Sequence, residues 1–279
     1  MAFLTPDRVR RINVDGTQLE INERIIPDSA RAPRQIASWV PAGGPMKPNA
    51  PLGGNGRPRG ITIHNTNDIN VPAGTNPAEQ YSRATWPNAN MRGVVVHFYI
   101  WRRDIWQILS LTERGWHASD GSGRRPSNRP GQQIGGNMDT IALEIIGNHP
   151  ETEETAAMLT AWLLKEFDLE PPTDLYTHNF FMGLAERIVP GAAKNCPLYI
   201  LPHWGQFKDR VAHFYNMLVE PAPKPVPEPD QDVVFGVVRQ VMALIRREDA
   251  EIMASRLNAE RDDPNSAFYH VVERPRPRP

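Results

Sequence analysis

The stretch Thr140-Ile141-Ala142-Leu143-Glu144-Ile145-Ile146 carries the clearest secondary-structure signal in the chain. Ile141, Leu143 and Ile145 alternate with Ala142 and Glu144, so the two sets lie on opposite faces of a predicted strand. The apolar residues around Glu144 are typical of a central strand, which is covered on both faces. A carboxylate in that position is either a functional group or, if the strand lies at an edge, one half of a surface ion pair.

Further strands and helices are predicted on both sides of this stretch. The β-type patterns fall at residues 61–64, at 94–101 with a hairpin partner at 105–109, and at 174–178. The helical patterns fall at residues 76–86, in the region that starts at Pro150, and around 204–218. Strands interleaved with helices predict an α/β domain with a mixed central β-sheet flanked by helices.

Proline is concentrated towards the two ends of the chain and in one linker. We therefore expect an irregular N-terminal strap at residues 1–60, with one strand or helix near 14–26, and a core domain at 61–220. Residues 221–231 read as a stiff Pro-rich linker. Residues 232–279 predict an amphipathic helix with a disordered tail. Its apolar stripe favours either docking on the core or self-association into a homo-oligomer.

Composition limits the classes of partner. The chain has 31 Lys and Arg against 32 Asp and Glu, so its charge gives no argument for nucleic acid or an anionic membrane surface. No run approaches the roughly 18 apolar residues of a membrane helix, so no membrane insertion is expected. The N-terminal residues lack the apolar centre of a secretory signal, which predicts synthesis in the cytoplasm without a signal peptide.

The segment Lys194-Asn195-Cys196-Pro197 holds the only cysteine. A single thiol is either a buried apolar filler or a chemical group. His64 and His178 end two predicted strands, and two imidazoles with one thiolate are the ligand count of a catalytic zinc site, which leaves a fourth position open. Lys194 is expected to lower the pKa of the thiol. Spacing alone leaves the zinc site and the ordinary buried cysteine both open.

Four motifs together resemble a known family. They are Ile-Thr-Ile-His-Asn-Thr at 61–66, Gly-Trp-His-Ala-Ser-Asp-Gly at 115–121, Asp-Thr-Ile-Ala-Leu-Glu-Ile at 139–145 and Lys-Asn-Cys-Pro at 194–197. In this order they resemble the zinc-dependent N-acetylmuramoyl-L-alanine amidases of the type-2 amidase and peptidoglycan-recognition-protein family, and most of all phage or prophage endolysins. The resemblance covers about residues 22–218.

The resemblance implies a role for each matching residue. His64, His178 and Cys196 match the ligands of one Zn²⁺ ion. Glu144 matches the general base and acid, and Lys194 matches the residue that stabilises the oxyanion. The alternative for Lys194 is a solvated loop charge, because lysines are mostly exposed.

Other positions near these motifs carry less information. The resemblance implies that His117 lines the substrate groove. Trp116 either stacks on a sugar or packs the loop, and His97 reads as a hydrogen-bonded interior histidine. The segments 122–138 and 181–193 are longer than the compact family pattern, and both should border the groove.

The resemblance predicts hydrolysis of the amide between N-acetylmuramic acid and L-alanine in peptidoglycan. We expect an endolysin that acts on the cell wall after release by a separate membrane-permeabilising protein. Two alternatives stay open: a non-catalytic peptidoglycan-binding module of the same fold, and a cytoplasmic amidase that recycles muropeptides.

Overall fold

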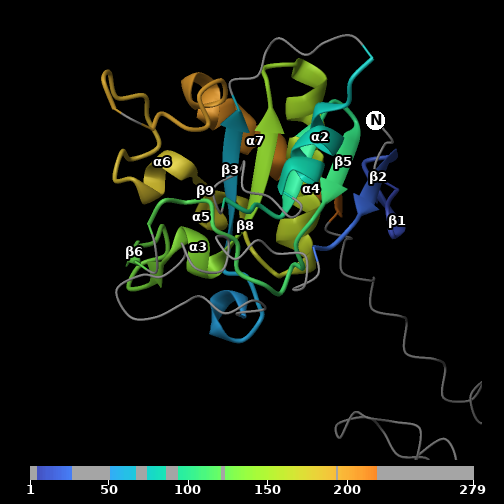
Figure 1. Cartoon of the computed structure of the whole chain (residues 1–279). Coiled ribbons are helices and arrows are strands. Elements are labelled where there is room, and N and C mark those ends of the chain that lie inside the picture. The colour runs from blue at the N-terminus through green and yellow to red at the C-terminus, as the bar shows by residue number, and fades with distance from the viewer. Residues whose placement is uncertain are drawn as a thin grey trace, which may run out of the picture. The chain divides into compact units, whose positions relative to one another are not determined.

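The computed structural model describes residues 5–26, 51–66, 74–85, 94–120, 123–192 and 194–218 (Figure 1). The chain divides after Glu220 into two units, and all of the described residues lie in the first. The expected linker and C-terminal helix lie outside the described residues, so their roles stay predictions. Within the described residues, no helix is both long and apolar enough to cross a membrane.

Seven strands form one mixed sheet in the order β1-β2-β5-β4-β8-β3-β9. Four of its neighbouring pairs are parallel (β2 with β5, β4 with β8, β8 with β3, and β3 with β9), and two are antiparallel hairpins. The strands are β1 Arg8–Val14, β2 Thr17–Glu23, β3 Gly60–Thr66, β4 Phe98–Trp101, β5 Asp104–Gln107, β8 Thr140–Ile146 and β9 Leu175–Thr177. A second, two-stranded sheet pairs β6 Arg125–Pro126 with β7 Gln133–Ile134.

Helices cover both faces of the main sheet, which confirms the predicted α/β class. The longer helices are α2 Pro77–Thr85, α4 Pro150–Glu166 and α7 Trp204–Leu218. Short helical turns complete the described elements: η2 Leu52–Gly54, α3 Gly136–Asp139, α5 Pro171–Asp174, α6 His178–Phe181 and η4 Leu201–His203. Figure 1 shows α4 and α7 behind the sheet and α2 in front of it.

The alternation predicted for β8 sorts its side chains between two hydrophobic clusters. Ile141, Leu143 and Ile145 pack with the buried faces of α4 and α7, whereas Ala142 packs on the other side with residues of α2 and β4. β8 lies between β4 and β3, so the central-strand prediction is confirmed. Because Glu144 shares the face of Ala142, its carboxylate points away from the large core.

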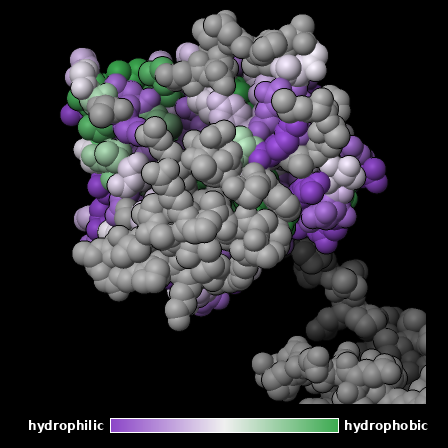
Figure 2. Space-filling view, in the orientation of Figure 1, coloured by the Kyte–Doolittle hydropathy of each residue, from purple (hydrophilic) through white to green (hydrophobic). Residues whose placement is uncertain are grey.

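The N-terminal region differs from the irregular strap that composition favoured. Residues 8–23 form the β1–β2 hairpin, and β2 extends the main sheet by pairing parallel to β5. Ile12, Val14, Leu19 and Ile21 alternate along the hairpin and join the larger core. Its outer face carries ion pairs such as Arg11–Glu20 at 2.8 Å, and Figure 2 shows hydrophilic surface on that side of the molecule. A charged outer face protects an edge strand from pairing with other chains.

Candidate metal centre

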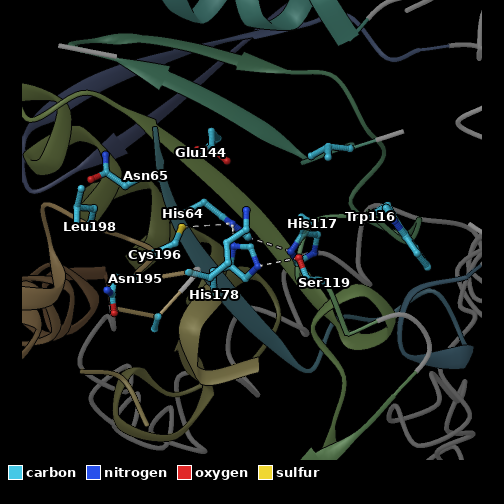
Figure 3. Close-up of a pocket in the computed structure, with 13 residues that line it drawn as sticks. His64, Asn65, Trp116, His117, Ser119, Glu144, His178, Asn195, Cys196 and Leu198 are labelled. Atoms are coloured by element: carbon cyan, nitrogen blue, oxygen red, sulfur yellow. Dashed lines mark hydrogen bonds between the residues drawn. The ribbon is translucent and has the colours of Figure 1, made fainter. Parts of the chain in front are cut away.

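The carboxyl ends of β3 and β9 bring the two predicted histidine ligands together. β3 and β9 are parallel and pair at Ile63 and Thr177, so His64 and His178 follow at the same edge of the sheet. The Nδ1 atoms of the two histidines lie 3.1 Å apart, and both side chains are 3% exposed. Figure 3 shows the two rings and the Cys196 thiol turned towards one another.

Cys196 comes from the segment between α6 and η4. Its Sγ lies 3.9 Å from His64 Nδ1, and the three ligand atoms fall within 4.8 Å of one another. The backbone carbonyl of Cys196 accepts a hydrogen bond from the Asn179 N–H at 2.8 Å, which ties this segment to the start of α6. The structure therefore gathers the three residues that the sequence singled out as metal ligands.

Two of the three distances between ligand atoms are close to those around a tetrahedral metal ion. A zinc ion with ordinary Zn–N and Zn–S bonds separates two nitrogen ligands by about 3.3 Å and a nitrogen from a sulfur by about 3.6 Å. The corresponding distances here are 3.1 Å and 3.9 Å. Two imidazole nitrogens and one thiol in a buried cluster are the donor set that zinc prefers, and they leave room for a further ligand.

Hydrogen bonds behind the two histidines favour binding through Nδ1. His64 Nε2 lies 3.0 Å from His117 Nδ1, and His178 Nε2 lies 3.3 Å from the Ser119 hydroxyl. A proton on each Nε2 leaves the Nδ1 lone pairs directed at the shared centre. Without a cation these two lone pairs would face each other at close range, which makes the arrangement suited to a metal ion.

Burial keeps the imidazoles neutral, as metal ligands must be. Burial first, and then the neighbouring histidines, lowers the pKa of His64 well below its usual value. Burial and the Lys194 ammonium lower the pKa of His178 to about 4. The thiol behaves differently from our expectation: Lys194 does lower its pKa, but burial outweighs that effect and raises it to about 12. Cys196 therefore needs a bound cation to become a thiolate ligand.

Glu144 stands beside this cluster. It is the register partner of His64 on the adjacent parallel strand, and both residues line the same cavity (Figure 3). Burial raises the pKa of Glu144 to about 8, and the Lys194 ammonium opposes the shift. Lys194 is exposed and lines the cavity, and it forms no ion pair with the residues that the structure describes. Glu144 and Lys194, the expected proton carrier and cation, therefore line the same cavity as the three clustered residues.

The cavity that contains these groups has a volume of about 560 Å³. Besides the residues already named, its walls include Asn65, Val94, Trp116, Ala192, Asn195 and Leu198. Trp116 lines the cavity and also packs against Val95 and Leu109, so both interpretations of this residue have a structural basis. The volume is sufficient for part of an extended substrate.

Residues 54–198, more than half of the chain, match the family model described as N-acetylmuramoyl-L-alanine amidase. The chain belongs to this amidase family. The three candidate metal ligands His64, His178 and Cys196 lie within the matched region. Glu144 and Lys194 lie within it as well.

Two curated members of the amidase family are similar in sequence. N-acetylmuramoyl-L-alanine amidase XlyA of Bacillus subtilis is 30% identical over 176 residues, which cover 62% of this chain and 49% of XlyA. CwlH of the same organism, also an N-acetylmuramoyl-L-alanine amidase, is 28% identical over 158 residues, which cover 56% of this chain and 53% of CwlH. The chain thus spans about half the length of these relatives. The solved catalytic domain of XlyA superposes with a TM-score of 0.48 at 25% identity and covers 68% of this chain and 98% of that domain.

The structure also places the other residues that the sequence singled out. His117 lines the cavity but is only 5% exposed, and its Nδ1 contacts the metal-cluster residue His64. Its expected contact with substrate stays a prediction. His97 is confirmed as an interior histidine: Nδ1 accepts the Ala142 N–H at 3.0 Å, and Nε2 donates to the Glu113 carbonyl at 2.9 Å.

Three polar residues that hold the site were not singled out from the sequence. Ser119 contacts His178, as described above. Asn137 accepts the backbone N–H groups of His117 and Ala118 at 2.6 and 2.8 Å. Asn65 joins the end of β8 to the segment after Cys196, because it donates to the Ile145 carbonyl and accepts the Tyr199 N–H. Ser119 and Asn65 lie within two of the recognised motifs, and this position was the available signal.

Proposed function

We propose that this chain is a zinc-dependent hydrolase of the amide bond between N-acetylmuramic acid and L-alanine in peptidoglycan. Membership of the amidase family supports the reaction. The observation that carries the proposal is the convergence of His64, His178 and Cys196, with ligand atoms within 4.8 Å, in the cavity that Glu144 and Lys194 also line.

His64, His178 and Cys196 would hold the metal ion. When bound, zinc supplies Lewis-acid chemistry, which polarises a carbonyl and makes water a stronger nucleophile near neutral pH. The neutral imidazoles provide the nitrogen ligands, and Ser119 and His117 fix the ring orientations from behind. The half-buried cavity excludes part of the bulk water, which strengthens the interactions of charged groups inside it.

Glu144 and Lys194 supply the remaining chemistry. Glu144 takes the proton from the attacking water and returns it to the amine nitrogen as the carbon–nitrogen bond breaks. A carboxyl group whose pKa burial raises to about 8 is suited to carrying a proton in both directions near neutral pH. The Lys194 ammonium faces the cavity and stabilises the negative charge that develops on the carbonyl oxygen.

The direct test is digestion of purified peptidoglycan followed by mass analysis of the products. The proposal predicts new L-alanine amino termini and intact glycan strands. New sugar reducing ends without new amino termini would make the protein a glycosidase, and no cleavage would favour the non-catalytic binding module. Addition of a chelator should abolish the activity, and zinc should restore it.

We further propose the bacterial cell wall as the place of action, with a role as a phage or prophage endolysin. The names of the curated relatives state the reaction but not the endolysin role. The form of peptidoglycan that the protein cleaves faster must therefore distinguish an endolysin from a recycling amidase. Intact cell walls and soluble muropeptides should be compared at equal concentrations of the scissile bond. Faster cleavage of intact walls supports the endolysin role, whereas a strong preference for soluble muropeptides supports the recycling amidase.

A further inference from the structure

The long segment between α6 and Cys196 joins two of the three clustered residues, since His178 opens α6 and Cys196 follows the segment. The sequence predicted that this segment borders the substrate groove. None of its described residues from 182 to 191, however, lines the 560 Å³ cavity. Its hydrogen bonds run instead to the residues that flank the two candidate ligands.

Asn179, the residue directly after His178, holds the segment from one end. It is fully buried, and its side-chain amide donates to the Arg187 carbonyl at 2.7 Å. Its backbone carbonyl accepts the Leu184 N–H at 2.9 Å, and its backbone N–H donates to the Cys196 carbonyl at 2.8 Å. Asn179 therefore ties the chain beside His178 to the middle of the segment and to Cys196.

Asn195, the residue directly before Cys196, holds the segment from the other end (Figure 3). Its side-chain oxygen accepts the Val189 N–H at 2.8 Å, and its side-chain nitrogen donates to the Val189 carbonyl at 3.0 Å. One amide thus pairs with both polar groups of one backbone residue, much as two antiparallel strands pair. This contact closes the chain that carries Lys194, and it fixes the approach of Cys196 to the cluster.

The turn in the middle of the segment has an unfavourable backbone conformation. Ala185 has a φ of 51° and Glu186 a φ of 55°. Two successive residues with side chains rarely lie in this left-handed region, and they stay there only where other interactions hold them. Glu186 makes such an interaction: its half-buried carboxylate accepts the Trp204 Nε1–H, at the start of α7, at 2.9 Å. The turn is therefore anchored on the core as well as on the two asparagines.

The position of Cys196 depends on these contacts. Paired strands fix the two histidines, whereas Cys196 lies on a segment without regular secondary structure. We propose that residues 183–189 form a brace that sets the position of Cys196 relative to His178, with Asn195 and Glu186 as positioning residues. A brace that holds the ligands in place before the ion arrives raises the affinity for that ion. This inference rests on the metal centre of the proposed function and adds what holds its ligands together.

The test measures zinc affinity by competition with a chromophoric chelator. Asn195→Ala should lower the affinity by about 10-fold, the lower end of the range for lost contacts around metal ligands. Glu186→Ala should have a similar effect, whereas Glu186→Gln should retain most of the affinity, because an amide oxygen still accepts the Trp204 Nε1–H. Asn195→Ala and Glu186→Ala release the same brace, so the double variant should lose less than the two separate losses combined.

The matched control is Asn22→Ala on β2, which breaks a hydrogen bond to Asp104 at 3.0 Å near the other end of the sheet. This variant should be less stable towards urea and bind zinc with unchanged affinity. The brace would be overturned by unchanged zinc affinity in Asn195→Ala or Glu186→Ala, by additive losses in the double variant, or by an equal loss in Asn22→Ala. None of these results would touch the proposed function, which fails only if the unaltered protein binds no zinc or releases no L-alanine amino terminus.

Discussion

His64 and Glu144 are register partners on the parallel strands β3 and β8, and both side chains line the 560 Å³ cavity. The alternation of each strand places Ile61, Ile63, Leu143 and Ile145 in the core on the opposite face. The same pattern that buries the hydrophobic residues therefore sets the proposed metal ligand and the proposed proton carrier on neighbouring strands. The centre of the sheet fixes their separation, as the proposed catalysis requires.

Replacing Glu144 with glutamine should remove the proton carrier and keep the side-chain shape. We expect kcat to fall by about 10²- to 10⁴-fold, the usual contribution of general acid–base catalysis. Zinc content, measured on the same preparation, should equal that of the unaltered protein, because Glu144 is not among the three clustered ligands. Activity within a few-fold of the original would remove Glu144 from the mechanism.

Lys194→Met should remove the cation and keep most of the aliphatic length. A donor that stabilises an oxyanion acts on the transition state, so kcat should fall by about 10²-fold with little change in KM. Lys208→Met is the control, since Lys208 lies on α7 near Glu186. A rise in KM at constant kcat would instead give Lys194 a role in ground-state binding.

His117→Phe should weaken zinc binding, because the ring that receives the His64 Nε2–H would be lost. Removal of such an outer partner typically lowers metal affinity by about 10- to 100-fold. Competition with a chromophoric chelator measures the affinity without reference to activity. His213→Phe, at an exposed position of α7, should leave it unchanged. Unchanged affinity in His117→Phe, with a higher KM, would return His117 to the substrate groove.

His97 predicts a loss of stability in acid. Burial lowers its pKa to about 4 in the folded protein, against about 6.5 when unfolded. Between these values the unfolded chain binds a proton that the folded protein does not, so stability falls as pH drops from 6.5 towards 4. The contribution of this residue amounts to about 3 kcal/mol. Urea unfolding of the metal-free protein at several pH values measures the free energy of unfolding. As the pH falls, this free energy should decline less steeply for His97→Gln than for the unaltered protein. Equal slopes would contradict the lowered pKa of His97.

The sequence predicted the parts of this structure that follow from local pattern. The alternation in β8 and the short strands before His64 and His178 were sufficient for the central sheet. The candidate ligands His64, His178 and Cys196 needed the family resemblance as well, because spacing alone left the zinc site open. The β1–β2 hairpin was harder to predict from the sequence, because its arginine and glutamate residues conceal the alternation of Ile12, Val14, Leu19 and Ile21. Contacts of long range, such as Ser119 with His178, have no periodic signal at all.

The thiol shows why sequence neighbours are poor guides to electrostatics. Lys194 precedes Cys196 by two residues, and it does lower the pKa of the thiol. Lys194 is exposed to water, however, whereas Cys196 is half-buried and burial has the largest effect on the pKa of its thiol. Loss of hydration of a buried thiolate exceeds the attraction of a solvated charge, so the net shift is upwards. Only the packing around Cys196 reveals which effect prevails.

The most direct test of the metal centre is the zinc content of the purified protein beside that of Cys196→Ser. Elemental analysis should find about one zinc ion per chain in the unaltered protein, as expected for a site with three protein ligands. The serine variant should keep its circular dichroism spectrum and lose most of the zinc. An unaltered protein that binds no zinc when it is supplied, or a serine variant that binds zinc with the same affinity, would contradict the account.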